Sequence, residues 1–287
     1  MTCLLSESVI QPKPILYLFI DGGYLRSVYK EFSAFLFNGT AINIDYEMIK
    51  YETQAKKVFY YDCIAPKKSS QSPEEYDSIK QNQQQVFDSI KMLPGFHVRE
   101  GVMRLRRKEF EQKQVDVGIA VDVLMHSVRK NMDQVVLLTG DLDFKPLVDA
   151  LLELGMYTTI MCERSSVSNE LLHSADDHLF FNYDDLYKWT TNSFKHENQM
   201  PITGIYAGQT LNHLTKLPIL ADAKLLKTGL DNETNPLFLY KKSSEYVIIR
   251  SKKGNHQEIY QFSDLNKLEI YIAKQHFSYI WSQDHKA

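Results

Sequence analysis

The sequence predicts an α/β fold with a central, mostly parallel sheet covered by helices, followed by a small C-terminal α+β domain. Several uninterrupted apolar runs have the length of a strand, and such runs are typical of strands buried on both faces of a sheet. Segments with helical spacing separate these runs, and the alternation of strand and helix predicts parallel pairing. The alternation stops near residue 195, where we place a domain boundary.

The first half of the chain contains two predicted strands and two predicted helices. Residues 1–14 are expected to form an arm, because its closing PKP delays regular structure. The elements that follow are a strand at 15–20, a helix ending near Phe37, a strand at 56–65, and a helix at 72–93 with Ser72 as N-cap and Pro73 in its first turn.

The second half continues the alternation and then departs from it. Residues 96–107 alternate as an edge strand or hairpin would. The predicted elements after them are a helix at 116–130, a strand at 133–140, a helix at 144–155 closed by Gly155, and a strand at 156–163. Residues 236–263 resemble an antiparallel meander, and a helical pattern follows at 265–277. The predicted units are therefore 1–14, 15–194 and 195–287.

Composition and charge indicate a protein of a reducing compartment. The net charge is −3, but residues 195–287 carry 12 Lys/Arg against 9 Asp/Glu, so the acidic excess lies in residues 1–194. The three cysteines are far apart and have no metal-ligand spacing, which favours buried, reduced thiols. The early apolar run at 15–20 is too short for a signal peptide or a membrane span. We expect a cytoplasmic protein with no membrane partner.

Four aspartates are placed where parallel α/β sheets bind their ligands, at the carboxyl ends of strands. Asp21 directly follows the strand at 15–20, and Asp141 and Asp143 directly follow the strand at 133–140. Asp116 opens the helix that leads into the latter strand, so it belongs to the same edge. If the two strands are neighbours, the four carboxylates converge.

Converging carboxylates need a partner, because two like charges at ~4 Å repel by roughly 4 kcal/mol at a surface-like dielectric. Oxygen-only ligation without nearby Cys or His favours Mg²⁺ or Mn²⁺. Each aspartate could instead be a separate helix cap or a solvated loop residue. We expect Asp141 to be a direct ligand and Asp143 to be stabilised in addition by a helix N-terminus. Asp122 points elsewhere on its helix and is interpreted as structural.

The motifs "FIDGGYL", "KQVDVGIAVDVL" and "LLTGDLDFKPLVDALLELG" resemble, in this order, the NYN domains of the PIN-like nuclease superfamily, in its LabA-like branch. The resemblance implies a PIN-like three-layer fold over about 15–190 and Mg²⁺- or Mn²⁺-dependent endonucleolytic RNA cleavage that leaves 5′-phosphate and 3′-hydroxyl ends. It implies catalytic and metal-binding roles for Asp21, Asp116, Asp141 and Asp143. Thr139 matches a small hydroxyl residue of the family. Tyr24 stands where many members have Asn.

A polyanionic substrate needs basic residues near such an acidic site. Arg104, Arg106 and Arg107 precede the Asp116 helix and Lys113 lies beside it, so we expect them along the rim of the site with RNA as partner. Arg99 and Lys108 belong to the same basic stretch. Tyr24 could stack on a base or pack in the core. In the tail, Lys241, Lys242, Arg250, Lys252 and Lys253 could bind RNA, bind a partner protein or only add solubility.

Three functions are considered on the basis of the sequence. The first is a metal-dependent ribonuclease. The second is a PIN-like binding or regulatory module without turnover, although such a module gains nothing from clustered repulsion. The third is a nucleotide-sugar transferase that uses Asp141 and Asp143 to hold Mn²⁺, which leaves Asp21 unexplained. A homo-oligomer is compatible with all three.

The basic stretch generates a first prediction. Exchange of Arg104, Arg106 and Arg107 for Glu should weaken RNA binding and flatten its salt dependence, because fewer counterions are released from the RNA. Fluorescence anisotropy with a labelled single-stranded RNA at several salt concentrations measures both effects. An unchanged salt slope would mean that these side chains face away from the RNA.

Overall fold

A computed structural model describes residues 13–64, 67, 70–101, 104–106, 109–111, 113–202, 205–207, 220–253, 256–275 and 278–284. Within these ranges the side chains at 104–106, 109–111, 113–114, 205–207 and 283–284 are not described. Of the predicted elements, the N-terminal arm lies almost wholly outside the described residues. No helix in the described part of the chain is long and apolar enough to cross a membrane.

The first sheet has six strands in the order β3-β2-β1-β6-β7-β8. Its strands are β1 (Leu16–Asp21), β2 (Lys57–Cys63), β3 (Phe96–Gly101), β6 (Gln134–Leu138), β7 (Tyr157–Glu163) and β8 (Asp177–Phe181). The pairings of β2 with β3, β1 with β2, β1 with β6 and β6 with β7 are all parallel. The predicted parallel sheet is therefore confirmed, and β3 is the edge strand that alternation predicted.

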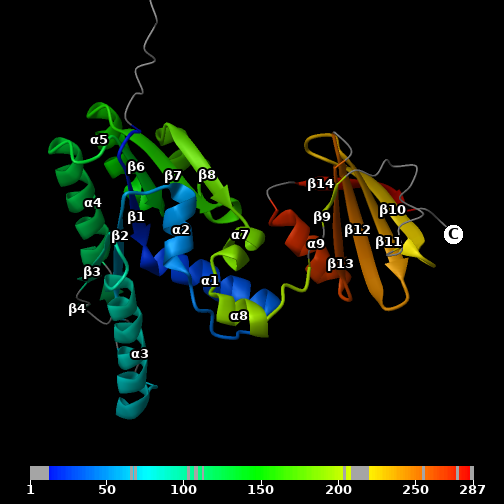
Figure 1. Cartoon of the computed structure of the whole chain (residues 1–287), viewed down its shortest axis with the longest axis horizontal. Coiled ribbons are helices and arrows are strands. Elements are labelled where there is room, and N and C mark those ends of the chain that lie inside the picture. Colours follow the sequence, from blue (N-terminus) through cyan, green and yellow to red (C-terminus); the bar gives the residue numbers. More distant parts are fainter. Residues whose placement is uncertain are drawn as a thin grey trace, which may run out of the picture. The chain divides into compact units, whose positions relative to one another are not determined.

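Helices lie on both sides of this sheet (Figure 1). They are α1 (Gly22–Leu36), α2 (Tyr46–Thr53), α3 (Pro73–Lys91), α4 (Lys113–Val128), α5 (Lys145–Glu153) and α6 (Asn169–Ser174). Helices α7 (Tyr183–Lys188) and α8 (Asn192–Glu197) follow β8 in the chain. Helix α3 begins as predicted, with Ser72 and Glu75 forming a reciprocal capping box. A two-stranded hairpin of β4 (Arg104–Arg106) and β5 (Glu109–Glu111) separates β3 from α4.

The period-two alternation of β1 and β2 decides which helix covers which face. Tyr17 and Phe59 point toward α4, where their ring centroids lie 5.4 and 4.8 Å from that of His126. Tyr60 points to the other face, where its ring contacts Tyr46 of α2 at 5.4 Å and Phe87 of α3 at 6.3 Å. Aromatic side chains therefore fill both layers between sheet and helices.

A second, antiparallel sheet occupies the C-terminal region, in the order β14-β10-β11-β12-β13-β9 (Figure 1). Its elements are β9 (Ile205–Ala207), β10 (Lys224–Asp231), β11 (Pro236–Lys242), β12 (Glu245–Lys252), β13 (His256–Phe262), α9 (Leu265–Ala273) and β14 (Tyr279–Asp284). Strands β11, β12 and β13 form the predicted meander. The predicted C-terminal α+β arrangement is thus confirmed.

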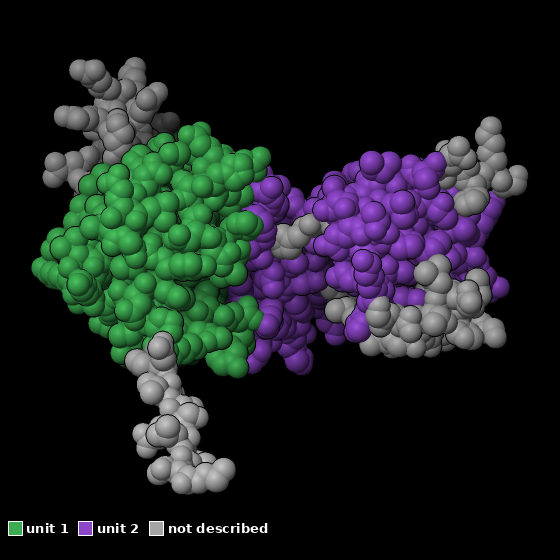
Figure 2. All heavy atoms as spheres, turned by 90° about the horizontal axis from the view of Figure 1, so that it is seen from above, with its two compact units in different colours: residues 1–26, 46–162, 167–179 green, residues 27–45, 163–166, 180–287 purple. Residues whose placement is uncertain are grey.

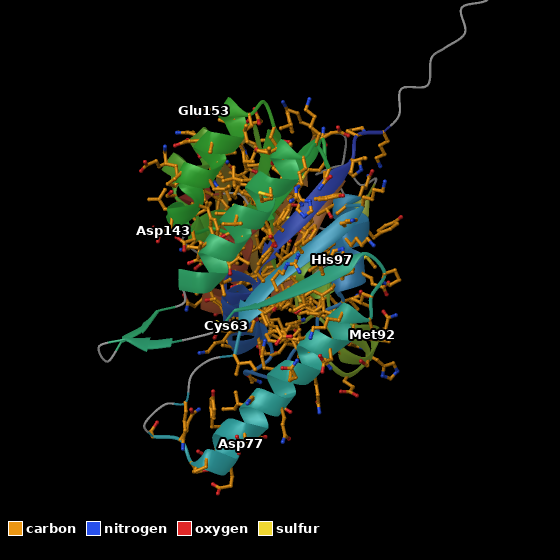
Figure 3. All side chains as sticks on the ribbon, turned by 90° about the vertical axis from the view of Figure 1, so that its left-hand side faces the viewer. Cys63, Asp77, Met92, His97, Asp143 and Glu153 are labelled. Carbon is orange, nitrogen blue, oxygen red and sulfur yellow. The ribbon has the colours of Figure 1, made fainter. Side chains whose placement is uncertain are left out.

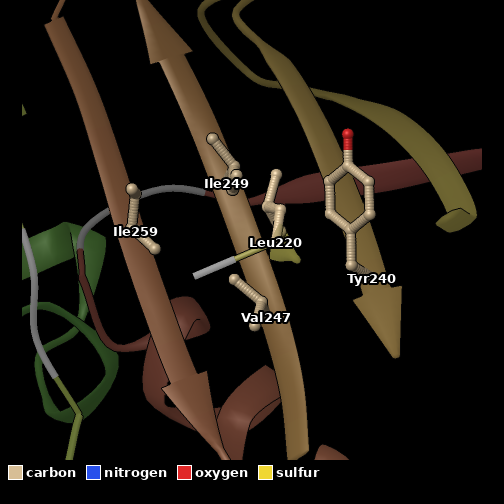
Figure 4. Close-up of a cluster of buried hydrophobic side chains, with 5 residues drawn as sticks. All are labelled: Leu220, Tyr240, Val247, Ile249 and Ile259. Atoms are coloured by element: carbon tan, nitrogen blue, oxygen red, sulfur yellow. The ribbon is translucent and has the colours of Figure 1, made fainter. Parts of the chain in front are cut away.

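Both faces of this second sheet carry buried apolar side chains. On one face Leu220 packs against Val247, Ile249 and Ile259 (Figure 4). On the other face Tyr260 lies 6.0 Å from Tyr271 of α9, measured between ring centroids. The second sheet therefore has a hydrophobic core of its own, and α9 covers one of its two faces.

One of the basic tail residues has a structural position that the sequence did not indicate. Arg250 is buried and donates hydrogen bonds to Asp231, Glu233 and Glu258, the first at 2.6 Å from Nε. Burial of the guanidinium charge is unfavourable in free energy, and the ion pairs with these carboxylates offset that penalty. Arg250 is therefore no part of an exposed RNA-binding patch, whereas Lys241 lies over the Tyr246 ring at 3.6 Å.

The chain divides into two compact units, shown in Figure 2. The first contains residues 1–26, 46–162 and 167–179, and the second contains 27–45, 163–166 and 180–287. In the second unit Lys274 of α9 forms an ion pair with Glu31 at 3.1 Å, and the Tyr271 hydroxyl donates to Asp184. Helix α9 is thus bound to residues that precede 195, and a domain boundary at 195 stays a prediction.

Two glycines generate a second prediction. A Cβ on Gly22 would lie 2.6 Å from the buried Tyr60 ring and 2.8 Å from Cβ of Asp62, so Gly22→Ala should destabilise the fold by roughly 1–3 kcal/mol. A Cβ on Gly118, inside α4, would meet only Tyr61 at 3.9 Å. Gly118→Ala should therefore stabilise the protein by up to about 1 kcal/mol. Urea denaturation of both variants tests this, and equal effects would contradict it.

Candidate active site

The candidate site lies where β1 and β6 end. These strands are paired in parallel with Ile20 opposite Leu138, so the residues that follow each strand share one edge of the sheet. Asp21 closes β1, and Thr139 follows β6. Figure 3 shows the labelled Cys63 at the end of β2 and the β4–β5 hairpin at this end of the sheet. The expectation that the two aspartate-bearing strands are neighbours is confirmed.

Asp21 is a buried carboxylate, with only 7% of its surface exposed. Its Oδ1 accepts a hydrogen bond of 3.0 Å from the backbone N–H of Tyr24, and its Oδ2 accepts one of 3.3 Å from the Thr139 hydroxyl. Burial raises the pKa of Asp21, the two hydrogen bonds lower it, and the nearby Asp141 raises it again. The net pKa is raised, because the hydrogen bonds do not fully offset the effect of burial on the charged carboxylate.

Thr139 connects Asp21 to the aspartates that follow β6. The Thr139 Oγ1 accepts from the backbone N–H of Asp141 at 3.2 Å, and Oδ1 of Asp141 accepts from the backbone N–H of Asp143 at 3.0 Å. Asp141 is thereby the N-cap of a short 3-10 helix at Leu142–Phe144 that leads into α5. Asp143 lies in the first turn of this 3-10 helix, at the helix N-terminus where we expected it, and the stabilisation of its charge there stays a prediction. The carboxylate that caps the turn is that of Asp141.

Asp116 approaches from the helix layer. Helix α4 begins at Lys113, three residues earlier than predicted, and Asp116 lies in its first turn, half-exposed. Burial raises the pKa of Asp116 to about 6, with further increases from the charges of Asp21, Asp141 and Asp143. The four predicted aspartates are therefore close enough to repel one another, although they come from three separate segments.

The chemistry of this donor set suits a hard divalent cation. Carboxylate oxygens are ligands of Mg²⁺ and Mn²⁺, and a cation would relieve the repulsion that adds to the effect of burial on the pKa of Asp116. Among the described residues, however, no three His, Cys, Asp or Glu side chains are grouped closely enough to hold a metal ion. The four aspartates interact through their charges and do not form a closed set of ligands.

The predicted substrate-binding residues are placed only in part. Arg104 and Arg106 are on β4 and Lys113 begins α4, but their side chains are not described, and Arg107 lies outside the described residues. Tyr24 is half-buried in the first turn of α1.

Arg99 of the basic stretch is paired with Asp122 of α4. The Arg99 Nε donates to Asp122 at 3.0 Å, and the Tyr61 hydroxyl donates to the same carboxylate at 2.8 Å. Asp122 therefore binds side chains of β2 and β3, which agrees with its interpretation as a structural residue.

A further acidic residue lies at this edge that was not predicted from the sequence. Asp62, near the end of β2, is fully buried and forms an ion pair with Arg26 of α1. It also accepts hydrogen bonds from the Tyr60 hydroxyl at 2.9 Å and from Gln83 of α3 at 3.1 Å. The signal was a carboxylate within the apolar run VFYYDCIA, where a buried charge requires a partner.

A family model of the NYN domain matches residues 39–184, just over half of the chain. A parallel sheet with aspartates gathered at its carboxyl edge, together with this match, places the chain in the NYN domain family. NYN domains belong to the PIN-like nuclease superfamily, so the fold is that of a nuclease. The match includes Asp116, Asp141 and Asp143 and begins after Asp21.

The solved structures that resemble this chain do so at low identity. A protein of unknown function from Vibrio parahaemolyticus is 19% identical over 62% of this chain and 97% of its own, with a TM-score of 0.45. A protein from Parabacteroides merdae, described as a putative oxidoreductase, is 8% identical over 92% of this chain and 80% of its own, with a TM-score of 0.24. No curated protein matches the chain.

The raised pKa of Asp116 generates a third prediction. Because its folded-state pKa of about 6 exceeds the unfolded value of 3.8, its contribution to stability is present below pH 4 and is lost as the pH rises through 6. In EDTA, Asp116→Asn should therefore match the wild type at pH 4 and be more stable at pH 7.5, by about 1 kcal/mol after solvent screening. Thermal or urea denaturation at both pH values measures this. A variant with the wild-type pH dependence would contradict it.

Proposed function

We propose that the protein is a Mg²⁺- or Mn²⁺-dependent endoribonuclease that hydrolyses phosphodiester bonds of RNA. The observation that carries the proposal is the gathering of Asp21, Asp116, Asp141 and Asp143 at one edge of an NYN domain, where burial and then the charges of the other three aspartates raise the pKa of Asp116 to about 6. Carboxylates arranged at the expense of stability are typical of functional sites.

Asp21 and Asp141 are our choice of direct metal ligands, and Asp116 and Asp143 would bind the ion directly or through water. When bound, the ion would activate water and stabilise the charge that develops on the phosphate during an in-line displacement. The chain's own contribution is orientation. Thr139 and the Tyr24 backbone N–H hold both oxygens of Asp21, and the capped turn at Leu142–Phe144 fixes Asp141.

A non-catalytic RNA-binding or regulatory module is the second candidate. The observation that favours it is the absence of a preformed group of three metal-ligating side chains among the described residues. The two candidate functions differ in whether the protein cleaves RNA. Purified protein should be incubated with labelled RNA, DNA and a nucleotide sugar, with Mn²⁺ or with EDTA. Mn²⁺-dependent cleavage of RNA supports the nuclease, and RNA binding without cleavage in Mg²⁺ or Mn²⁺ supports the module.

The position of Asp21 generates a fourth prediction. Asp21→Asn should reduce Mn²⁺-dependent RNA cleavage by roughly 100-fold or more, because the neutral amide binds a divalent cation poorly. Its fold should persist, since the amide oxygen can still accept from the Tyr24 N–H and the amide NH2 can donate to the Thr139 hydroxyl in place of the bond it replaces. Asp149→Asn is the matched control, because Asp149 is exposed on α5 and paired only with Lys145 at 2.7 Å among the ion pairs of the described residues. Full activity in Asp21→Asn would remove this residue from the mechanism.

A further inference from the structure

The ion pair of Arg26 and Asp62 places a cation at the edge of the sheet that carries the four aspartates. Asp21 ends β1, and Arg26 lies one turn further along the chain, on α1. On β2, Tyr61 is the strand partner of Asp21, and Asp62 is the next residue. Asp62 and Tyr60 point to the face of the sheet opposite α4. Arg26 therefore borders the acidic edge from the side that Asp116 does not occupy.

The contacts of Asp62 hold one end of the Arg26 guanidinium. The Asp62 carboxylate is fully buried, and the Arg26 Nη1 that it pairs with is also buried. Oδ1 of Asp62 accepts from the Cys63 backbone N–H at 2.7 Å, and Oδ2 accepts from Tyr60 and Gln83. A carboxylate with this many donors cannot turn, so the ion pair keeps the Nη1 end of the guanidinium beside it, although among the described residues Nη1 makes no hydrogen bond of its own.

The remainder of the Arg26 side chain is accessible. It is 39% exposed although Nη1 is buried, and a guanidinium has five N–H donors in a rigid planar fork. Burial raises the pKa of the Cys63 thiol, Arg26 lowers it, and Asp116 and Asp21 raise it. The charge of Arg26 and those of the aspartates therefore act on the same neighbourhood at the end of β2.

We propose that Arg26, positioned by Asp62, binds a backbone phosphate of the RNA next to the acidic site. This inference rests on the proposed nuclease function. The four carboxylates repel the phosphodiester group on which they act. A fixed cation beside them is therefore needed to hold the RNA backbone. A planar guanidinium matches the paired oxygens of a phosphate, and pre-orientation by Asp62 reduces the entropy lost on binding.

A single exchange of Arg26 would leave Asp62 buried without its counterion and could unfold the protein. The pair is therefore tested by two variants. Asp62→Asn retains the Arg26 cation, because an amide oxygen can still accept from Arg26 and Tyr60. The double variant Arg26→Gln with Asp62→Asn removes the cation and leaves no unpaired buried charge. The matched control is Arg129→Gln, an exposed arginine beyond the end of α4 that is remote from the acidic edge.

The fifth prediction concerns the binding of a labelled single-stranded RNA in EDTA, measured by anisotropy over a range of salt concentrations. The double variant should bind roughly tenfold more weakly than the wild type. Its slope of log affinity against log salt should be shallower by about 0.7, the value of one phosphate contact on a single strand. Asp62→Asn should keep the wild-type slope, and Arg129→Gln should keep both slope and affinity. Circular dichroism checks that each variant is folded.

Cleavage with Mn²⁺ is measured in parallel, so that the two proposals can fail separately. A folded double variant with wild-type affinity and slope would overturn the role of Arg26 and leave the nuclease proposal intact. A wild-type protein that binds RNA but does not cleave it with Mg²⁺ or Mn²⁺ would overturn the nuclease proposal, and the slopes would still decide whether Arg26 contacts phosphate. A wild-type protein without affinity for RNA would overturn both.

Discussion

The parallel pairing of β1 with β6 is the constraint on which the candidate site depends. Because Ile20 lies opposite Leu138, the residues after the two strands leave the sheet side by side, and Thr139 can reach Asp21. A shift of one residue in this register would turn Asp21 toward the other face, away from α4 and Asp116. The acidic site is thus a consequence of strand register, and the hydrogen bonds of Thr139 and Tyr24 only adjust it.

The same edge shows how differently a protein can treat two buried carboxylates. Asp62 is compensated by a full shell of donors and a guanidinium, so its charge is stabilised within the fold. Asp21 receives two hydrogen bonds and faces another carboxylate, and its pKa is raised. A satisfied carboxylate contributes to structure, whereas an undercompensated one retains affinity for an external cation. This contrast separates the two aspartates in role although they end adjacent strands.

The sequence predicted the sheet because uninterrupted apolar runs such as residues 15–20 are buried on both sides, and this pattern has few alternatives. It predicted Asp21, Asp116 and Asp141 at one edge because parallel strands bring their carboxyl ends together. The cap role of Asp141 stayed one of several alternatives, because the 3-10 turn depends on a contact between residues two apart that spacing does not reveal. Asp62 and Arg26 were missed because ion pairs between distant segments follow from packing. Helix α2 was also missed, since only Tyr46, Ile49 and Thr53 of its residues are buried.

The contacts of α9 also bear on the order in which the chain can fold during synthesis. The Lys267 ammonium donates to the carbonyl of Phe35, a contact between residues 232 positions apart, and Lys274 pairs with Glu31. All four aspartates, by contrast, lie within the first 143 residues. On the ribosome the first sheet and its acidic edge can therefore assemble while α9 is still unmade. Glu31 and Phe35, in the later turns of α1, gain these two partners only when the last part of the chain has been made, although Tyr29 and Phe32 can already pack against α7. One side of this helix is therefore completed early and another side late.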